Sequence, residues 1–403
     1  APLIAYQFNP LENVNVFSND ASLLLPTSAL DNRYLVLGWP QTLALTDDPF
    51  TNGTIDLRSF LTIVGIEDET TVVLNLRTDI LPGSDIPAAS AGDMLVLSLN
   101  RGEVLNLETD GFNADFTGTE LFSDDAAKPI AVFVGSEASD SPYFESFLER
   151  SCCADHLEQQ VFPESSYGNN FVAVKTPSRS VYVEKAGWDV GVIPDEPEYW
   201  RVMGTTEDTR VSTNLLPPDD SFRLQRGEAR LIEAKKDFTI SASGPVAVAQ
   251  VPGSQRTTGI PSTLSGGERP PGGDPSLILL PPVEQWRDQY LFLVPNKYAF
   301  DFLLIASPVG TEILYDGLPI DEVIDCEYAE VGSLGEGEQA VSYQAMRCPL
   351  SDPHPSSAGF QDDGVHSLQA VGGESFGLVV WGWDSFVSYG YPGGSNVGLI
   401  NLL

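Results

Sequence analysis

The four cysteines are the first residues of this sequence that could carry chemistry. They are Cys152, Cys153, Cys326 and Cys348, an even number, which in an exported protein indicates disulfide bonds. Cys326 and Cys348 flank a polar stretch of hairpin size, so we expect a disulfide between them. By the entropy of the closed loop, such a bond would stabilise the fold by roughly 3 kcal/mol.

Cys152 and Cys153 are adjacent and stand beside Asp155 and His156. This local cluster is compatible with a strained vicinal disulfide, with separate pairings or a free thiol, or with a soft metal ion. A tetrahedral zinc site normally gathers its ligands from two separated pairs, and the sequence has no second Cys/His pair. The sequence therefore favours cysteine chemistry over a metal here, with Cys152 and Cys153 as a disulfide candidate.

Nucleophilic catalysis finds little support in the sequence. The only histidines are His156, His354 and His366, and there is no GxSxG elbow, HExxH helix or Walker loop. His354 lies in a proline-flanked loop and His366 in a strand-like run, where a structural or exposed histidine is expected. Carboxylate pairs of the glycosidase kind arise by chance among 57 acidic residues. We expect a protein without enzymatic activity.

Clustered carboxylates offer a different chemistry, because Ca²⁺ prefers oxygen ligands. The candidates lie in one acidic turn and in the acidic run that follows it. They are Glu67, Asp68, Glu69, Asp115, Asp124 and Asp125. Their spacing does not match an EF-hand loop, and acidic hairpin turns are usually solvated. A bound calcium ion and a plain solvated surface both stay open.

Aromatic residues crowd the segment WGWDSFVSYGY near the end of the chain. Strand alternation places Trp381 and Trp383 on one face, with Tyr389 and Tyr391 close behind them in the sequence. Two interpretations remain: the four side chains form a core seam, or they form an exposed patch for protein or glycan recognition.

The elements that must position these residues are short β-rich runs whose order recurs three times. Each series begins with a proline followed eight positions later by an aromatic residue: Pro26 and Tyr34, Pro163 and Phe171, Pro282 and Tyr290. A hairpin follows each, with Thr70, Thr209 and Thr311 five residues after Gly65, Gly204 and Ala306. The closing runs KPIAVFVG, GPVAVAQVPG and FGLVVWGW are short, apolar and bounded by Gly or Pro, which indicates buried strands.

The repeated order predicts an all-β fold of three tandem, β-sandwich-like (Ig-like) units. We place them at residues 23–140, 141–275 and 276–403, with a short helix in the connector near 141–160 and a Gly/Pro-rich linker ending the second unit. Residues 1–22 contain APLIAYQFNP, which matches the closing runs. We expect the last strand of a truncated upstream unit there, or a strand that adds to a neighbouring molecule.

The charge of the chain narrows its partners. Lys and Arg total 21 against 57 Asp and Glu, a formal charge of −36, which repels nucleic acid and anionic lipid. No apolar run approaches the roughly 20 residues that span a bilayer, so direct membrane insertion is not expected. The start of the chain lacks a basic signal-peptide region, and we expect an export signal or lipid anchor to lie outside this chain.

Several long blocks carry a family resemblance that covers nearly the whole chain. AYQFNPL, DFTGTELFSDDAAKPIAVFVG, CCADHLEQQVFPESSYG, GDPSLILLPPVEQWRDQYLFLVP and FGLVVWGWDSFVSYGYPGG resemble the IgG Fc-binding protein N-terminal domain. Its bacterial members are typically surface lipoproteins or secreted proteins. The resemblance implies an extracellular, cell-surface binding or adhesion module whose partner is a protein or glycan on another cell or matrix. A structural subunit that self-assembles through its N-terminal strand is the alternative function.

Overall fold

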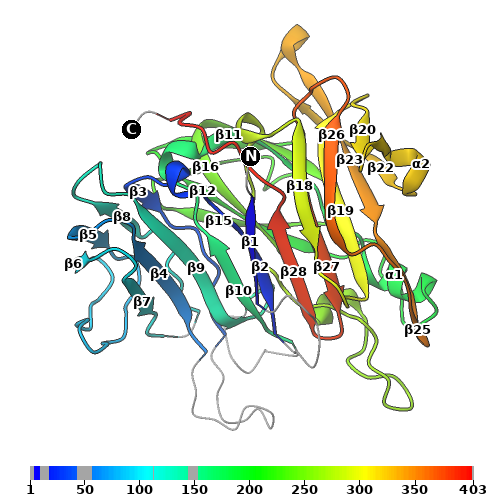
Figure 1. Cartoon of the computed structure of the whole chain (residues 1–403), viewed down its shortest axis with the longest axis horizontal. Coiled ribbons are helices and arrows are strands. Elements are labelled where there is room, and N and C mark those ends of the chain that lie inside the picture. Colours follow the sequence, from blue (N-terminus) through cyan, green and yellow to red (C-terminus); the bar gives the residue numbers. More distant parts are fainter. Residues whose placement is uncertain (1–3, 10–17, 43–56, 112, 144–152, 402–403) are drawn as a thin grey trace.

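The computed structural model describes residues 4–9, 18–42, 57–111, 113–143 and 153–401 of the chain (Figure 1). Strands account for 48% and helices for 7%, so the fold is mostly β, and every strand pairing is antiparallel. Among the described residues, no helix is both long and apolar enough to cross a bilayer.

Three sets of four paired strands, which we call the leading layers, share one order of strands. The first pairs β3 (Arg33–Leu35), β8 (Glu120–Ser123), β5 (Thr70–Asn75) and β6 (Met94–Leu99). The second pairs β11 (Gly168–Ala173), the first half of β16 (Phe238–Pro252), β13 (Thr209–Thr213) and β14 (Ser221–Leu224). The third pairs β18 (Gln289–Val294), β26 (Gly364–Ala370), β20 (Ile313–Tyr315) and β21 (Leu318–Pro319). The first and third are separate sheets, and the second is part of a seven-stranded sheet that continues through β16.

Each leading layer has a second layer built around one central strand. In the first, β4 (Ser59–Gly65) lies between β7 (Val104–Glu108) and β9 (Ile130–Ser139), with β10 (Asp155–Gln160) beyond β9. In the second, β12 (Glu198–Gly204) lies between β15 (Ala229–Ala234) and the second half of β16, with β17 (Ile278–Leu279) beyond. In the third, β19 (Phe300–Pro308) lies between β23 (Val341–Pro349) and β27 (Gly377–Asp384), with β28 (Val387–Pro392) beyond.

The start of each leading layer is built from the same local signals. Pro26, Pro163 and Pro282 each precede a 3-10 turn, because proline supplies the backbone angle that such a turn needs at its start. These turns are η1 (Thr27–Ala29), η3 (Glu164–Ser166) and η5 (Val283–Gln285). The repeat aromatics that follow, Tyr34, Phe171 and Tyr290, are all buried in the core.

The hairpin threonines also make the same contact three times. Each hydroxyl donates a hydrogen bond to the backbone carbonyl three residues earlier and so closes the turn between two strands. The pairs are Thr70 to Glu67 at 2.8 Å, Thr209 to Thr206 at 3.0 Å and Thr311 to Pro308 at 2.9 Å.

The connector differs from the expectation of a short helix near 141–160. Asp155–Gln160 forms strand β10, paired with β9, so a helix is wrong for these residues. The alternating burial of DHLEQQ shows that pairing with β9, and not local helix propensity, decides its structure. Residues 144–152 lie outside the described part of the chain. Two short helices that the sequence did not reveal are α1 (Arg179–Lys185) and α2 (Ile320–Val323).

The N-terminal strand has a partner inside the chain. β1 (Ala5–Asn9) pairs with β2 (Asp20–Leu24) to form a two-stranded ribbon near the centre of the view in Figure 1. The rings of Tyr6 and Phe8 pack against Tyr391 of β28, with centroid distances of 4.6 and 5.6 Å. Adding this strand to a neighbouring molecule through the edge that binds β2 would therefore break an existing pairing.

The three stretches of chain that carry these repeated elements, residues 26–160, 163–279 and 282–392, pack against one another through shared cores. One hydrophobic cluster joins Leu61 of β4 to Tyr199 of β12, and another joins Val172 of β11 to Trp381 of β27. Figure 1 shows the first stretch in blue and cyan, on the side of the molecule opposite the third stretch in yellow to red. The packing of one stretch on another decides which leading layers have their outer faces covered by protein. A leading layer left uncovered can bind a ligand.

Candidate binding groove

The aromatic segment near the end of the chain is a core seam. Trp381, Trp383, Tyr389 and Tyr391 are each 0% exposed, so the alternative of an exposed recognition patch at these positions is wrong. Trp383 stacks on the rings of Phe300 and Trp381 with centroid distances of 4.4 and 4.7 Å. β27 lies between β19 and β28, and six consecutive residues in it are buried, so both of its faces meet protein.

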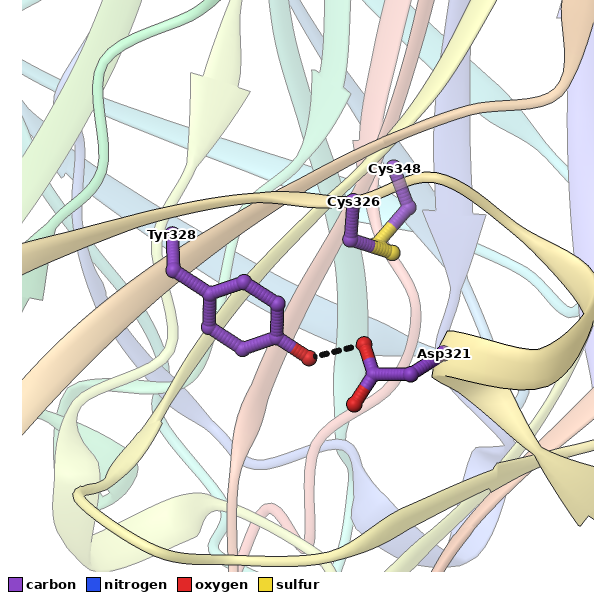
Figure 2. Close-up of a disulfide and its surroundings, with 4 residues drawn as sticks. All are labelled: Asp321, Cys326, Tyr328 and Cys348. Carbon is purple, nitrogen blue, oxygen red and sulfur yellow. Dashed lines mark hydrogen bonds between the residues drawn. A yellow bond between two sulfur atoms is a disulfide. The ribbon is translucent and has the colours of Figure 1, made fainter.

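The disulfide between Cys326 and Cys348 is confirmed. It closes a separation of 22 residues and ties the start of β22 (Glu327–Leu334) to β23 (Figure 2). Beside it, the hydroxyl of Tyr328 donates to the carboxylate of Asp321 at 2.5 Å, which links β22 to α2. Cys153 is also disulfide-bonded, and Cys152 lies outside the described residues, so their expected pairing stays a prediction.

The calcium candidates are spread over separate contacts. The Asp115 carboxylate pairs with the guanidinium of Arg201 at 2.9 Å, and Asp125 accepts the backbone N–H of Ala127. The acidic turn of Glu67, Asp68 and Glu69 joins β4 to β5, and Asp124 follows β8. Within the described ranges, no three His, Cys, Asp or Glu side chains are arranged to hold a metal ion.

The histidines make contacts that suit structural roles. His366 is 7% exposed, and its Nδ1 lies 2.8 Å from the carboxylate of Asp316. Its ring stacks on Tyr315 with a centroid distance of 5.1 Å. His156 stacks on Phe60 at 5.8 Å.

A buried polar junction lies where β10, β17 and β28, the outer strands of the three second layers, meet, and no sequence pattern predicted it. The Asp20 carboxylate accepts backbone N–H groups from Glu158 of β10 at 3.0 Å and from Leu277, just before β17, at 3.1 Å. Asp155, at the start of β10, accepts the N–H of Ser388 from β28 at 3.2 Å. Asp274 donates its own N–H to the Ser388 hydroxyl at 3.0 Å.

Burial sets the electrostatics of this junction. Desolvation raises the pKa of Asp20, Asp155 and Asp274 well above the ordinary carboxylate range, although backbone N–H donors oppose the shift. The charge of the buried Arg179, which pairs with Glu196 at 3.7 Å, acts to lower the pKa of Asp274 but does not outweigh the burial. Fully buried and assembled from three stretches, the junction holds the molecule together and does not face a ligand.

The space best suited to a ligand is a groove of 840 Å³, within the size range of known ligand sites. One wall is the outer face of the third leading layer, with Leu291, Gln289 and Gln369. The opposite wall is formed by the end of β2 and by η1, with Leu24 and Pro26. Ser395, Asn396 and Val397 close one end.

The groove combines apolar and polar surface. Leu291 is 50% exposed, an unusual state for a leucine in the middle of a strand. Two side chains of opposite charge, Arg287 and Asp316, also line the groove. Gln289 and Gln369 are cross-strand neighbours, so their amides lie side by side. Such a surface can bury an apolar side chain and hydrogen-bond the polar groups around it.

A second cleft, of 450 Å³, lies between the second and third stretches. It contains Lys175 and Arg347, but both already have partners in the protein. The Lys175 ammonium donates to the carbonyl of Thr176 at 2.9 Å, and the Arg347 guanidinium pairs with Asp237.

Comparisons with known proteins give one match. No curated protein and no solved structure matches the chain. The family model described as IgGFc binding protein matches residues 20–382, which include all three leading layers. The chain therefore belongs to the IgGFc binding protein family.

Proposed function

We propose that this chain is an extracellular, non-catalytic binding module at a cell surface, with three tandem Ig-like sandwich units as its scaffold. It recognises a protein or glycan ligand on another cell or matrix and uses the groove to do so. Membership of the IgGFc binding protein family supports a binding role, and the Cys326–Cys348 disulfide fits an oxidising environment outside the cytosol.

The recurring strand order supports the tandem-unit scaffold. Each stretch repeats the proline, the 3-10 turn, the buried aromatic residue and the threonine turn bond in the same sequence. Rigid sandwiches of this kind commonly present binding surfaces at their ends and edges. The observation that carries the proposal is the groove of 840 Å³ with the exposed Leu291 in its wall.

An array of extracellular proteins and glycans, probed with the intact chain, tests the proposal. The array is run with calcium and with a chelator, because the acidic turn of Glu67, Asp68 and Glu69 is still a candidate calcium site. We expect at least one saturable ligand. A chain that binds no protein or glycan under either condition would refute the binding role.

A further inference from the structure

We propose that the groove binds an extended peptide segment of a protein partner, in which a proline is followed four residues later by an aromatic residue. This inference rests on the proposed function and names its site and its class of partner. It comes from comparing three equivalent positions within the chain, two of which are occupied by such a segment.

The three positions differ in how exposed the residue directly after each repeat aromatic is. Leu35, Val172 and Leu291 follow Tyr34, Phe171 and Tyr290 and point to the outer face of their leading layers by strand alternation. Their exposed fractions are 0%, 7% and 50%. Segments of the chain cover the first two side chains. The third side chain is half exposed, although the carbonyl of Leu291 already accepts the hydroxyl of Tyr6 from β1 at 2.9 Å. A ligand in the groove would therefore contact the Leu291 side chain and not its carbonyl.

The first position is covered by the proline turn of the second stretch. Tyr167, which ends η3, donates its hydroxyl to the carbonyl of Leu35 at 2.8 Å. Ser165 of the same turn donates to the carboxylate of Asp31 at 2.6 Å. The turn and its aromatic residue therefore lie along the edge strand β3.

The second position is covered in the same way by the turn of the third stretch. The Glu284 carboxylate of η5 accepts the N–H of Asn169 at 3.2 Å and the side-chain amide of Asn170 at 2.9 Å. Trp286, which ends η5, lies in one hydrophobic cluster with Val172. Both covered positions thus receive a proline-led turn that ends in a large aromatic ring.

The third position faces η1, which lacks the features that fill the other two. Leu30 stands four residues after Pro26, where Tyr167 and Trp286 follow Pro163 and Pro282. Pro26 is exposed, whereas Pro163 and Pro282 are buried. The η1 turn forms the wall of the groove opposite β18, and the groove occupies the space between them.

The lining of the groove matches the chemistry of the two segments that fill its counterparts. Leu291 and Leu314 offer apolar contact to an aromatic or proline ring. Gln289 corresponds to Asn170, which binds Glu284 in the second position, so its amide can meet a carboxylate or carbonyl of the peptide. The positive charge of Arg287 favours an acidic residue in the same place.

Two synthetic peptides taken from the filled positions serve as probes, FPESSYG and LPPVEQWRD, each with a terminal fluorophore. Fluorescence anisotropy with the full-length chain should show saturable binding of at least one of them and none of its scrambled version. Leu291→Arg should weaken this binding roughly tenfold or more, because it places a charge where the aromatic ring packs.

Two further variants keep the test specific. Val365→Arg is the matched control, since Val365 is 66% exposed on the same face of the sheet but does not line the groove. Its peptide binding should equal that of the wild type. Leu30→Tyr places an aromatic residue at the position of Tyr167 and Trp286, directly after the groove-lining Ala29, and should weaken peptide binding by competing for the same surface.

Three outcomes would overturn the inference. They are the absence of saturable binding by either peptide, equal losses in Leu291→Arg and Val365→Arg, and a concentration-dependent dimer that Leu291→Arg abolishes. The last result would assign the groove to a second copy of the chain. If the array yields a ligand whose binding Leu291→Arg leaves unchanged, the binding role stands, but its assignment to the groove falls together with this inference.

Discussion

The backbone N–H of Ser388 donates to the buried carboxylate of Asp155 across 233 residues of sequence, at 3.2 Å. This contact joins β28 of the third stretch to β10 of the first. The hydroxyl of Ser388 accepts the backbone N–H of Asp274, which precedes β17 of the second stretch. One serine thus connects all three stretches through two buried acidic residues, and their protonation should affect the stability of the molecule.

Asp274→Asn should flatten the pH dependence of stability. Burial raises the pKa of Asp274 well above its ordinary value near 3.8. A raised pKa in the folded state means that this group's stability contribution is complete below the unfolded pKa and is lost as pH rises through the folded pKa. Asparagine has no proton to lose, so the variant should gain stability relative to the wild type as pH rises. Urea denaturation between pH 4 and pH 8 measures this.

Asp316→Asn is the control, because the ionisation of Asp316 should change stability with pH in the direction opposite to that of Asp274. Burial acts to raise the pKa of Asp316, but hydrogen bonds from His366 and Ser367 outweigh it and lower the pKa. Its contribution is present above the unfolded pKa and is lost as pH falls through the folded pKa. A loss of stability in Asp274→Asn that is largest at neutral pH would contradict the first prediction, because it would show that Arg179 needs the ionised carboxylate.

Removing the Cys326–Cys348 disulfide should lower the free energy of unfolding by about 3 kcal/mol, from the entropy of the closed loop. The double variant Cys326→Ala/Cys348→Ala tests this by denaturant unfolding. Wild-type protein treated with a reductant should approach the curve of the variant. A variant as stable as the oxidised wild type would show that the hairpin of β22 and β23 needs no covalent closure.

Arg226→Gln should destabilise the contact between the first two stretches by about 2 kcal/mol. The Arg226 guanidinium contacts Glu120 at 2.5 Å and binds Glu164, whose side chain is only 3% exposed. Loss of the cation leaves the Glu164 carboxylate buried without its partner. Arg223→Gln is the control, because the Arg223–Asp208 pair is 60% and 67% exposed and should contribute less than about 1 kcal/mol. Equal effects of the two variants would contradict the prediction.

The sequence predicted the local features well because they depend on short-range chemistry. The β-rich runs and the hairpins that follow the proline–aromatic pairs each depend on residues within about eight positions of one another. The 3-10 turns after the prolines and the threonine turn bonds were found only in the structure. The Cys326–Cys348 disulfide was also predictable, since it closes a single hairpin. The connector was mispredicted because pairing with β9 outweighed the helix-like composition of Asp155–Gln160.

The site could not be predicted in the same way. Asp20 and Asp274 look like any of the other acidic residues in the sequence, and Asp155 was noted only beside Cys152 and Cys153. Their shared burial between the stretches distinguishes all three. Leu291 and Leu35 both directly follow a repeat aromatic residue, and they differ only in whether another part of the chain packs on them. Whether a leading layer is covered depends on the arrangement of the three stretches, which no local pattern records.

Val96→Lys should suppress self-association at high salt without changing stability by more than about 0.5 kcal/mol. Met94 and Val96 on the edge strand β6 are 64% and 56% exposed, and MLVLSL carries no charge. The corresponding edges, β14 and β21, are shorter and contain Arg223 and Pro319, which discourage edge-to-edge pairing. The charge of −36 keeps copies apart at low salt, and screening at 1 M NaCl removes that repulsion.

Sedimentation velocity at 0.1 and 1 M NaCl measures this association. We expect larger species of the wild type only at the higher salt concentration, and their loss in Val96→Lys. Leu318→Lys on β21 is the control, because Leu318 is 54% exposed on a strand of two residues. Oligomers that survive Val96→Lys would place self-assembly elsewhere on the molecule and would restore β1 as the candidate for strand exchange.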